Sequence, residues 1–284
     1  MKKLLLAALS LFSFIVNAQE LENSLLWKIS GNGLEKPSYL YGTVHITCDA
    51  TLSDKVLEAL DATTQLYLEL DMDDPSMQAQ MMKGMMMKDG TKMSTLASPE
   101  DFKLVDEFLT KNVGMSAKLM DNFKPAMVSM MLMPKIIACP IQSVENELIK
   151  VTKEQEEEVY GLESVAVQMA MFDAIPYEEQ MQELIKSAKD NMAADKIKYE
   201  KMMEIYNSKN LNAIMDFMNE EENKMYGDNS EIMLDNRNIS WIPKIEEAAK
   251  ATPTFFGVGA AHLPGDKGVI KLLREKGYKV EAVK

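Results

Sequence analysis

The sequence predicts an α/β fold: a small mixed sheet of N- and C-terminal strands that carries two Gly-x-x-His loops, with a large helical insertion. Three observations favour this class. β-Prone and helical segments alternate at both ends of the chain, helix-permissive segments fill the middle, and two strand-Gly-x-x-His units echo each other. The 284 residues, 46% hydrophobic and 26% charged, exclude a disordered or fibrous chain.

The first elements follow from local patterns. Apolar, β-prone segments separated by glycines and a proline predict a hairpin, a helix then begins at the N-cap Ser53, and an alternating strand follows. In that strand Glu69 and Asp71 share one face, because side chains alternate. The expected ranges are 24–30 and 38–44 for the hairpin, 53–62 for the helix and 65–73 for the strand.

The middle of the chain, at about 75–141, is predicted to be a helical insertion, because it is Met-rich and interrupted only by scattered glycines and prolines. Alternation then returns, and Gly277 is expected to end the last helix. The later elements are predicted as strand 157–162, helix 164–173, several helices within 177–250, strand 254–258, helix 266–276 and strand 278–283.

The chain is acidic, with 31 Lys and Arg against 44 Asp and Glu and a net charge of −13. This balance lacks the basic surface typical of nucleic-acid binding, so we expect no nucleic-acid partner. Only Arg237 and Arg274 are arginines. Because a planar guanidinium suits bidentate contacts with carboxylates, each is a candidate for a specific contact.

Residues 1–18 have the pattern of a secretory signal peptide: two lysines, an apolar run and a Val-Asn-Ala ending. The run is shorter than the roughly 20 apolar residues of a spanning helix. We therefore expect residues 19–284 to form an exported single domain, periplasmic or secreted, with no stable membrane span. Two cysteines often pair in such an oxidising compartment, but the sequence leaves open whether Cys48 and Cys139 do, and the closeness of Cys48 to His45 leaves a ligand or redox role as the alternative.

The two histidines of the chain each follow a glycine at the end of an aromatic strand. SYLYGTVH ends in Gly42-x-x-His45, and TFFGVGAAH ends in Gly259-x-x-His262. A glycine at a strand end lets the backbone bend tightly. Histidine is the commonest metal ligand and an acid or base near neutral pH, so the repeated unit predicts one shared site.

Carboxylates and one arginine are placed to complete such a site. Glu69 and Glu163 lie on or just after predicted strands at the edge where the histidine loops emerge, and Asp71 is a third candidate. A divalent ion takes carboxylate oxygens beside imidazole nitrogens. Arg237 and Asn238, in the string LDNRN, can clamp a carboxylate or stabilise an oxyanion.

Six short strings occur in order along most of the expected mature chain: YLYGTVH, LYLELD, KPAMVSMML, YGLESVAVQM, LDNRN and VGAAHLPGDKGVIKLLREKGYKV. Together they resemble the TraB/GumN family, which is similar to the Tiki metalloproteases. The resemblance implies an α/β fold with both Gly-x-x-His motifs at the active site, and peptidase-like hydrolysis that depends on Mn²⁺ or Co²⁺. One departure is Ala126, where the family has an aromatic residue after Lys-Pro.

The resulting hypothesis is an exported metal-dependent hydrolase that acts on a peptide or protein. A divalent ion, Mn²⁺ or Co²⁺ first and Zn²⁺ as a further possibility, would activate water. Either glutamate would be ligand or general base, Arg237 would stabilise negative charge and Asn238 would orient a ligand. The expected metal ligands are His45, His262, Glu69 and Glu163.

An alternative is a non-catalytic metal- or protein-binding periplasmic protein with a Met-rich helical surface. Residues 77–93 hold seven methionines, whose thioethers are soft ligands for Cu(I). Methionine is also a flexible filler of cores and a builder of adaptable apolar surfaces. A third possibility is a scaffold whose site has lost activity. The substrate and the oligomeric state are not readable from the sequence.

Overall fold

Six strands form one mixed sheet in the order β4-β3-β5-β2-β1-β6. The structure is a computed structural model that describes residues 21–284, so the predicted signal peptide at 1–18 lies outside the described residues. The strands are β1 Leu26–Ser30, β2 Ser38–Thr43, β3 Gln65–Leu68, β4 Glu158–Gly161, β5 Phe255–Gly259 and β6 Lys279–Ala282. The predicted α/β class, with its sheet of N- and C-terminal strands, is confirmed.

Strands β4, β3, β5 and β2 run parallel, whereas β1 is antiparallel to both β2 and β6. The β2–β5 register pairs Thr43 with Gly259. The carboxyl ends of the four parallel strands therefore meet at one edge, and the Gly-x-x-His loops leave that edge side by side. Ligands of open α/β sheets commonly bind outside this edge.

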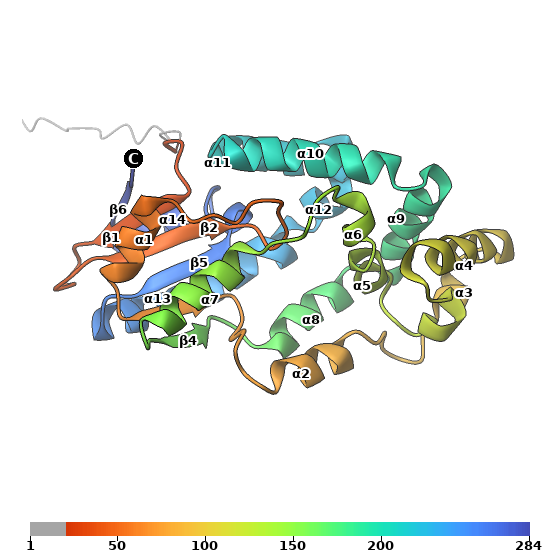
Figure 1. Cartoon of the computed structure of the whole chain (residues 1–284), viewed down its shortest axis with the longest axis horizontal. Helices are drawn as coiled ribbons and strands as arrows, with labels where there is room; N and C mark the ends of the chain where they lie inside the picture. Colours follow the sequence, from red (N-terminus) through yellow and green to blue (C-terminus); the bar gives the residue numbers. More distant parts are fainter. Residues whose placement is uncertain (1–20) are drawn as a thin grey trace, which may run out of the picture.

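Helices cover both faces of the sheet (Figure 1). On one face Phe256, fully buried, packs with residues of α13 (Asn236–Ala251) and α14 (Val269–Glu275). On the other face Phe255, also fully buried, packs with residues of α1 (Asp54–Asp61) and α7 (Val144–Glu154). Consecutive side chains of β5 thus anchor opposite cores, as alternation along a strand requires.

The predicted insertion is helical, and it forms a second hydrophobic core beside the sheet (Figure 1). That core is completed by α9, Tyr177–Asp190, from beyond the insertion. The insertion contains α2 Met77–Gly84, α3 Met93–Leu96, α4 Pro99–Val113, the short η1 Ala117–Met120, α5 Pro125–Met130 and α6 Met133–Ile136. The remaining helices are α8 Val165–Ala174, α10 Ala193–Asn207, α11 Leu211–Met218, η2 Glu221–Asn223, α12 Lys224–Asp228, a π-helical turn η3 Glu231–Asp235 and η4 Ala260–His262.

Most methionines of the 77–93 segment take part in packing. Met87 and Met93 are buried in the second core. A smaller cluster around Leu70 and Met169 is flanked by three more, Met77, Met81 and Met85. Core filling therefore accounts for most of the Met-rich composition, as expected for a flexible apolar side chain.

Two boundaries differ from the sequence prediction. β3 ends at Leu68 rather than continuing to residue 73, because the chain turns there and the Glu69 carboxylate accepts a hydrogen bond from the amide of Gly259. α14 begins at Val269 rather than at residue 266, because Gly265, with φ of 92°, turns the chain first. Gly277, with φ of 92°, follows the end of α14 as predicted.

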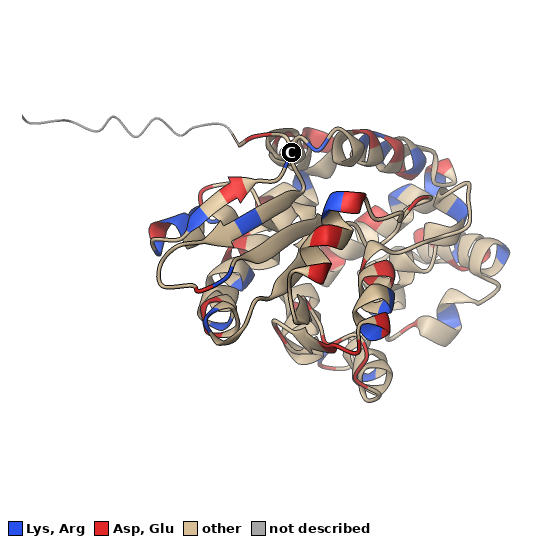
Figure 2. Cartoon of the chain, turned by 60° about the vertical axis from the view of Figure 1, so that its left-hand side comes forward, with Lys and Arg blue, Asp and Glu red and all other residues tan. Residues whose placement is uncertain are grey.

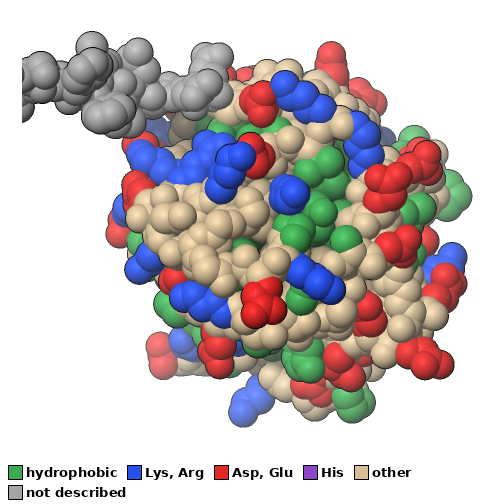
Figure 3. Space-filling view, turned by 90° about the vertical axis from the view of Figure 1, so that its left-hand side faces the viewer, with side chains coloured by type: hydrophobic (Ala, Val, Ile, Leu, Met, Phe, Trp, Pro, Cys, Tyr) green, Lys and Arg blue, Asp and Glu red, His purple; other side chains and the backbone are tan. Residues whose placement is uncertain are grey.

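None of the helices described between residues 21 and 284 has the length and hydropathy needed to cross a membrane. Acidic and basic residues are interspersed along the outer helices (Figure 2). On the face shown in Figure 3, hydrophobic side chains gather at the centre among lysines, and neither histidine is visible.

The glycine of the first Gly-x-x-His motif is explained by close approach rather than by a special backbone bend. Gly42 has no positive φ, and a Cβ built there would lie 3.1 Å from Cα of Ala260 in the neighbouring loop. The hydroxyl of Tyr206, on α10, donates to the Gly42 carbonyl at 3.0 Å. Both contacts require the two loops to pack tightly together.

We expect Gly42→Ala to lower the free energy of unfolding by about 1–3 kcal/mol, the usual cost of forcing an extra methyl group into a packed site. Urea denaturation followed by circular dichroism measures this loss. Gly33→Asn is the control, because nothing lies within 4 Å of a Cβ at Gly33 and Asn tolerates its φ of 84°. Equal stability of Gly42→Ala and wild type would contradict the packing argument.

Candidate active site

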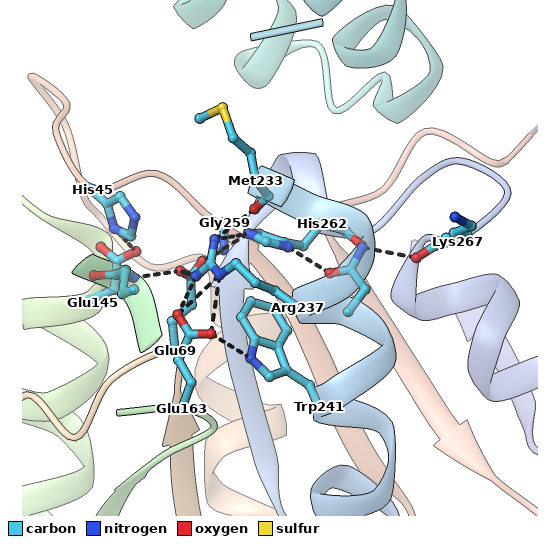
Figure 4. Close-up of polar contacts among 12 residues, drawn as sticks. His45, Glu69, Glu145, Glu163, Met233, Arg237, Trp241, Gly259, His262 and Lys267 are labelled. Carbon is cyan, nitrogen blue, oxygen red and sulfur yellow. Dashed lines mark hydrogen bonds and ion pairs between the residues drawn. The ribbon is translucent and has the colours of Figure 1, made fainter. Parts of the chain in front are cut away.

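Arg237 forms the centre of a buried polar network at the carboxyl edge of the sheet (Figure 4). It lies in the first turn of α13, directly after the π-helical turn, and is 8% exposed. Its Nη2 donates to Glu69 Oε2 at 2.6 Å and to Glu163 Oε1 at 2.7 Å. One guanidinium therefore bridges both carboxylates that the sequence singled out.

The two glutamates are neighbours because strand pairing continues past the ends of β3 and β4. The amide of Glu163 donates to the carbonyl of Glu69 at 2.9 Å. Each carboxylate also has its own neutral donor: Gly259 N–H donates to Glu69 Oε1 at 2.8 Å, and Trp241 Nε1 donates to Glu163 Oε2 at 3.1 Å. Buried carboxylates require such partners to remain charged.

His262, 4% exposed, is held in one tautomer by Asn238. The amide nitrogen of Asn238 donates to the carbonyl of Lys267 at 2.9 Å, so its Oδ1 faces His262 Nδ1 at 2.6 Å and accepts a hydrogen bond from the Nδ1–H group. The Nε2 lone pair is then free to accept from Arg237 Nη1 at 3.1 Å. A histidine oriented in this way through its other nitrogen is typical of metal ligands.

Burial and charge set the protonation states inside the network. Burial lowers the pKa of His262 to about 3, and Arg237 adds to this effect, so the ring is neutral near pH 7. Burial opposes ionisation of Glu69, but the His262 ring, the Arg237 guanidinium and the Gly259 amide together lower its pKa to about 2. The network thus presents a neutral imidazole beside an ionised carboxylate.

His45 lies outside this network. Its side chain is 62% exposed, and its Nδ1 forms an ion pair with Glu145 Oε1 at 2.8 Å (Figure 4). Partial burial opposes the charged form, but the contact with Glu145 raises the pKa of His45 to about 9. The charge of His45 also contributes to the lowered pKa of Glu69, so these two side chains are electrostatically coupled.

The third carboxylate candidate, Asp71, does not join the network. It lines a cavity of about 330 Å³ beside the ends of β3 and β4, together with Tyr67, Tyr160 and Glu163. Burial raises the pKa of Asp71 to about 6, and the nearby Asp73 adds to the shift. Glu163 is the residue that connects this cavity to the Arg237 network.

Sequence reasoning missed two side chains of the site. Trp241 was detectable, because it lies four residues after Arg237 on one helix face, and its ring is 4.8 Å from the guanidinium carbon. Glu145 had no comparable signal. An acid in the first turn of a helix is ordinarily explained by the helix dipole, and the pairing with His45 is 100 residues away in sequence.

The donors of the network suit a divalent ion in kind: the Nε2 lone pair of His262 and the oxygens of Glu69 and Glu163. In the described structure they are all engaged by the guanidinium of Arg237. Among residues 21–284, no three His, Cys, Asp or Glu side chains are arranged to hold a metal ion. An ion that takes this donor set must therefore replace the guanidinium.

The protein is an α/β protein with a mixed sheet that contains four parallel strands. The acidic side chains of the site and one histidine gather at the carboxyl ends of those strands. The chain belongs to the TraB/PrgY/gumN family, whose family model matches residues 25–282. This match confirms the resemblance found in the sequence. No curated protein and no solved structure is matched.

Replacing Glu145 by Gln is expected to lower the pKa of His45 from about 9 toward its ordinary value of 6.5, because the negative charge is lost. NMR titration of the two imidazoles measures this directly. Since the folded pKa lies above the unfolded one, the pair stabilises the fold fully below about pH 6.5 and loses its effect as the pH rises through about 9. A pKa unchanged by the substitution would contradict the ion pair.

Replacing Arg237 by Met is expected to cost about 3–5 kcal/mol of stability at neutral pH, because two buried carboxylates lose their countercharge. The loss should shrink as the pH falls from about 4.5 toward 2, the window set by the lowered pKa of Glu69. Urea denaturation at several pH values tests both points. Arg274→Met is the control, because Arg274 is exposed and its guanidinium donates to the backbone carbonyl of Val280 and lies over the Trp27 ring, with no buried carboxylate to neutralise; equal losses would contradict the account.

Proposed function

We propose that this protein is an exported metal-dependent hydrolase that cleaves peptide-like amide bonds. The observation that carries the proposal is the meeting of Glu69, Glu163 and His262 around one cationic position at the carboxyl edge of the sheet. Carboxylates, a neutral imidazole and a guanidinium are the groups needed to activate water and stabilise an oxyanion. Membership of the TraB/PrgY/gumN family is consistent with it.

The residues that would hold the ion are His262 and Glu69, with His45 joining from the neighbouring loop and Glu163 beside them. Mn²⁺ and Co²⁺ suit this mixture of nitrogen and oxygen donors best, and Zn²⁺ is also compatible. When bound, such an ion lowers the pKa of a coordinated water and polarises the scissile carbonyl. Besides supplying the ligands, the protein would shield these donor atoms from water and hold them in position.

The roles of the two glutamates differ by their surroundings. Glu163 lines the cavity of about 330 Å³, whereas Glu69 is enclosed by Gly259, His262 and Arg237. We therefore assign Glu163 as the general base that takes a proton from water, and Glu69 as a ligand. The cavity, with its stacked pair of Tyr67 and Tyr160, is the place for a substrate side chain.

Arg237 and Asn238 complete the chemistry. The neighbouring carboxylates outweigh the effect of burial and raise the pKa of Arg237, so its charge persists. Once released from the glutamates, the guanidinium is available to stabilise the developing charge on the substrate oxygen. Asn238 holds the His262 ring so that Nε2 faces the reaction centre.

An exported location is supported by the signal-peptide pattern at 1–18 and by the disulfide between Cys48 and Cys139. Disulfides persist mainly in oxidising compartments such as the periplasm or the cell exterior. The protein would then act on its peptide or protein substrate outside the cytoplasm.

Thermal denaturation of chelator-stripped protein, residues 19–284, tests the metal centre. Mn²⁺ is expected to raise the melting temperature of the wild type, because an ion that binds only the native state stabilises it. His262→Ala and Glu69→Gln should lose the shift, and Arg237→Gln should show a larger one because the competing guanidinium is gone. Asp71→Asn is the control, since Asp71 lies outside the network, and it should keep the shift.

Failure of Mn²⁺, Co²⁺ and Zn²⁺ to change the melting temperature of the wild type would contradict the proposed function. A shift that appears only with Cu(I) and survives His262→Ala would point instead to the Met-rich binding protein. A positive result leads to a screen of peptide substrates with the wild type and Glu163→Gln, which should retain metal and lose turnover.

A further inference from the structure

The ion pair between His45 and Glu145 lies next to the proposed metal centre and belongs to none of the roles assigned so far. Glu145, 3% exposed, sits in the first turn of α7, and its Oε1 is 2.8 Å from His45 Nδ1. The hydroxyl of Ser143 donates to its Oε2 at 2.9 Å. The carboxylate is therefore fixed on one side by the helix cap and offers its other oxygen to the imidazole.

A disulfide and several hydrogen bonds join the segment after His45 to the segment before α7, and we call this set of contacts the clamp. Cys48, three residues after His45, is disulfide-bonded to Cys139. Thr47 and Gln142 exchange backbone hydrogen bonds of 3.0 and 2.9 Å, which forms an isolated antiparallel bridge. The Gln142 side chain also donates to the carbonyl of Cys48 at 3.0 Å.

The clamp explains how a pair 100 residues apart in sequence is held at contact distance. One side of the clamp lies within three residues of His45, and the other side within six residues of Glu145. The segment that carries His45 lies outside the six strands, and the clamp ties it to the segment just before α7. Loss of the disulfide would let the two side chains move apart.

We propose that Glu145 is the positioning residue of His45, and that the Cys48–Cys139 clamp holds this residue pair in place. Contact at Nδ1 fixes the ring and leaves Nε2 as the nitrogen that can bind a metal ion once the ion has displaced its proton. A carboxylate placed behind a metal-binding histidine orients the ring and increases its basicity. This inference rests on the proposed function. It adds Glu145 as a positioning residue and the Cys48–Cys139 disulfide as a redox-sensitive support of the site.

A purely structural role for Glu145 makes a different prediction. An acid in the first turn of α7 interacts favourably with the helix dipole, so its loss would reduce stability and leave metal affinity unchanged. Glu145→Gln separates the two roles, because glutamine keeps the size of the side chain and an oxygen for Ser143 but removes the charge. Glu147→Gln is the matched control: Glu147 lies in the same turn, is 42% exposed and pairs only with Lys150.

The experiment is calorimetric titration of the oxidised, metal-free chain with Mn²⁺. We expect Glu145→Gln to weaken Mn²⁺ binding by about 10- to 100-fold, the range for residues behind a ligand, and Glu147→Gln to bind like the wild type. The double variant Cys48→Ser with Cys139→Ser should also bind more weakly. Wild-type affinity in Glu145→Gln, or an equal loss in Glu147→Gln, would overturn the proposal.

A second readout needs no metal and separates failure of this inference from failure of the proposed function. The chain has only two histidines, so the imidazole carbon resonances of His45 can be identified by comparison with His45→Gln. In Glu145→Gln the chemical shifts of these resonances should change, and their line widths should change because the ring is no longer held in one orientation. Glu147→Gln should leave both unchanged. If the wild type does not bind Mn²⁺, an unchanged His45 signal in Glu145→Gln overturns the proposal, and a changed one supports it.

Discussion

The guanidinium of Arg237 is the interaction on which the rest of the site depends. It contacts Glu69, Glu163 and His262, which come from the ends of two strands and from the loop after a third. Two buried carboxylates without a cation would protonate or destabilise the fold. The parallel pairing of β3, β4 and β5 is what brings these groups together, and the start of α13 supplies the charge that makes their burial possible.

Each donor of the site also has a neutral hydrogen-bond partner besides Arg237. The donors are fixed by neutral partners of their own: Gly259 for Glu69, Trp241 for Glu163 and Asn238 for His262. Each donor therefore keeps one partner other than Arg237, although the carboxylates depend on Arg237 for charge balance. A divalent ion would meet donors that are already oriented, which reduces the cost of binding.

Much of the fold follows from local patterns, because strand alternation and helix caps are short-range signals. The sequence located all six strands, but it extended the strand that carries Glu69 past Leu68, since alternation continues through residues that instead turn into the network. It also identified Arg237 and Asn238 from their chemistry. The pairing of His45 with Glu145 was not predictable, because it depends on a long-range clamp whose disulfide the sequence left open.

The most direct test of the account is a crystal structure of the mature chain grown with Mn²⁺, with diffraction data collected at the manganese absorption edge. The account predicts one anomalous peak among Glu69, Glu163 and His262 Nε2, with the guanidinium of Arg237 displaced from both carboxylates. An anomalous peak elsewhere on the chain, with Arg237 still bonded to Glu69 and Glu163, would contradict it.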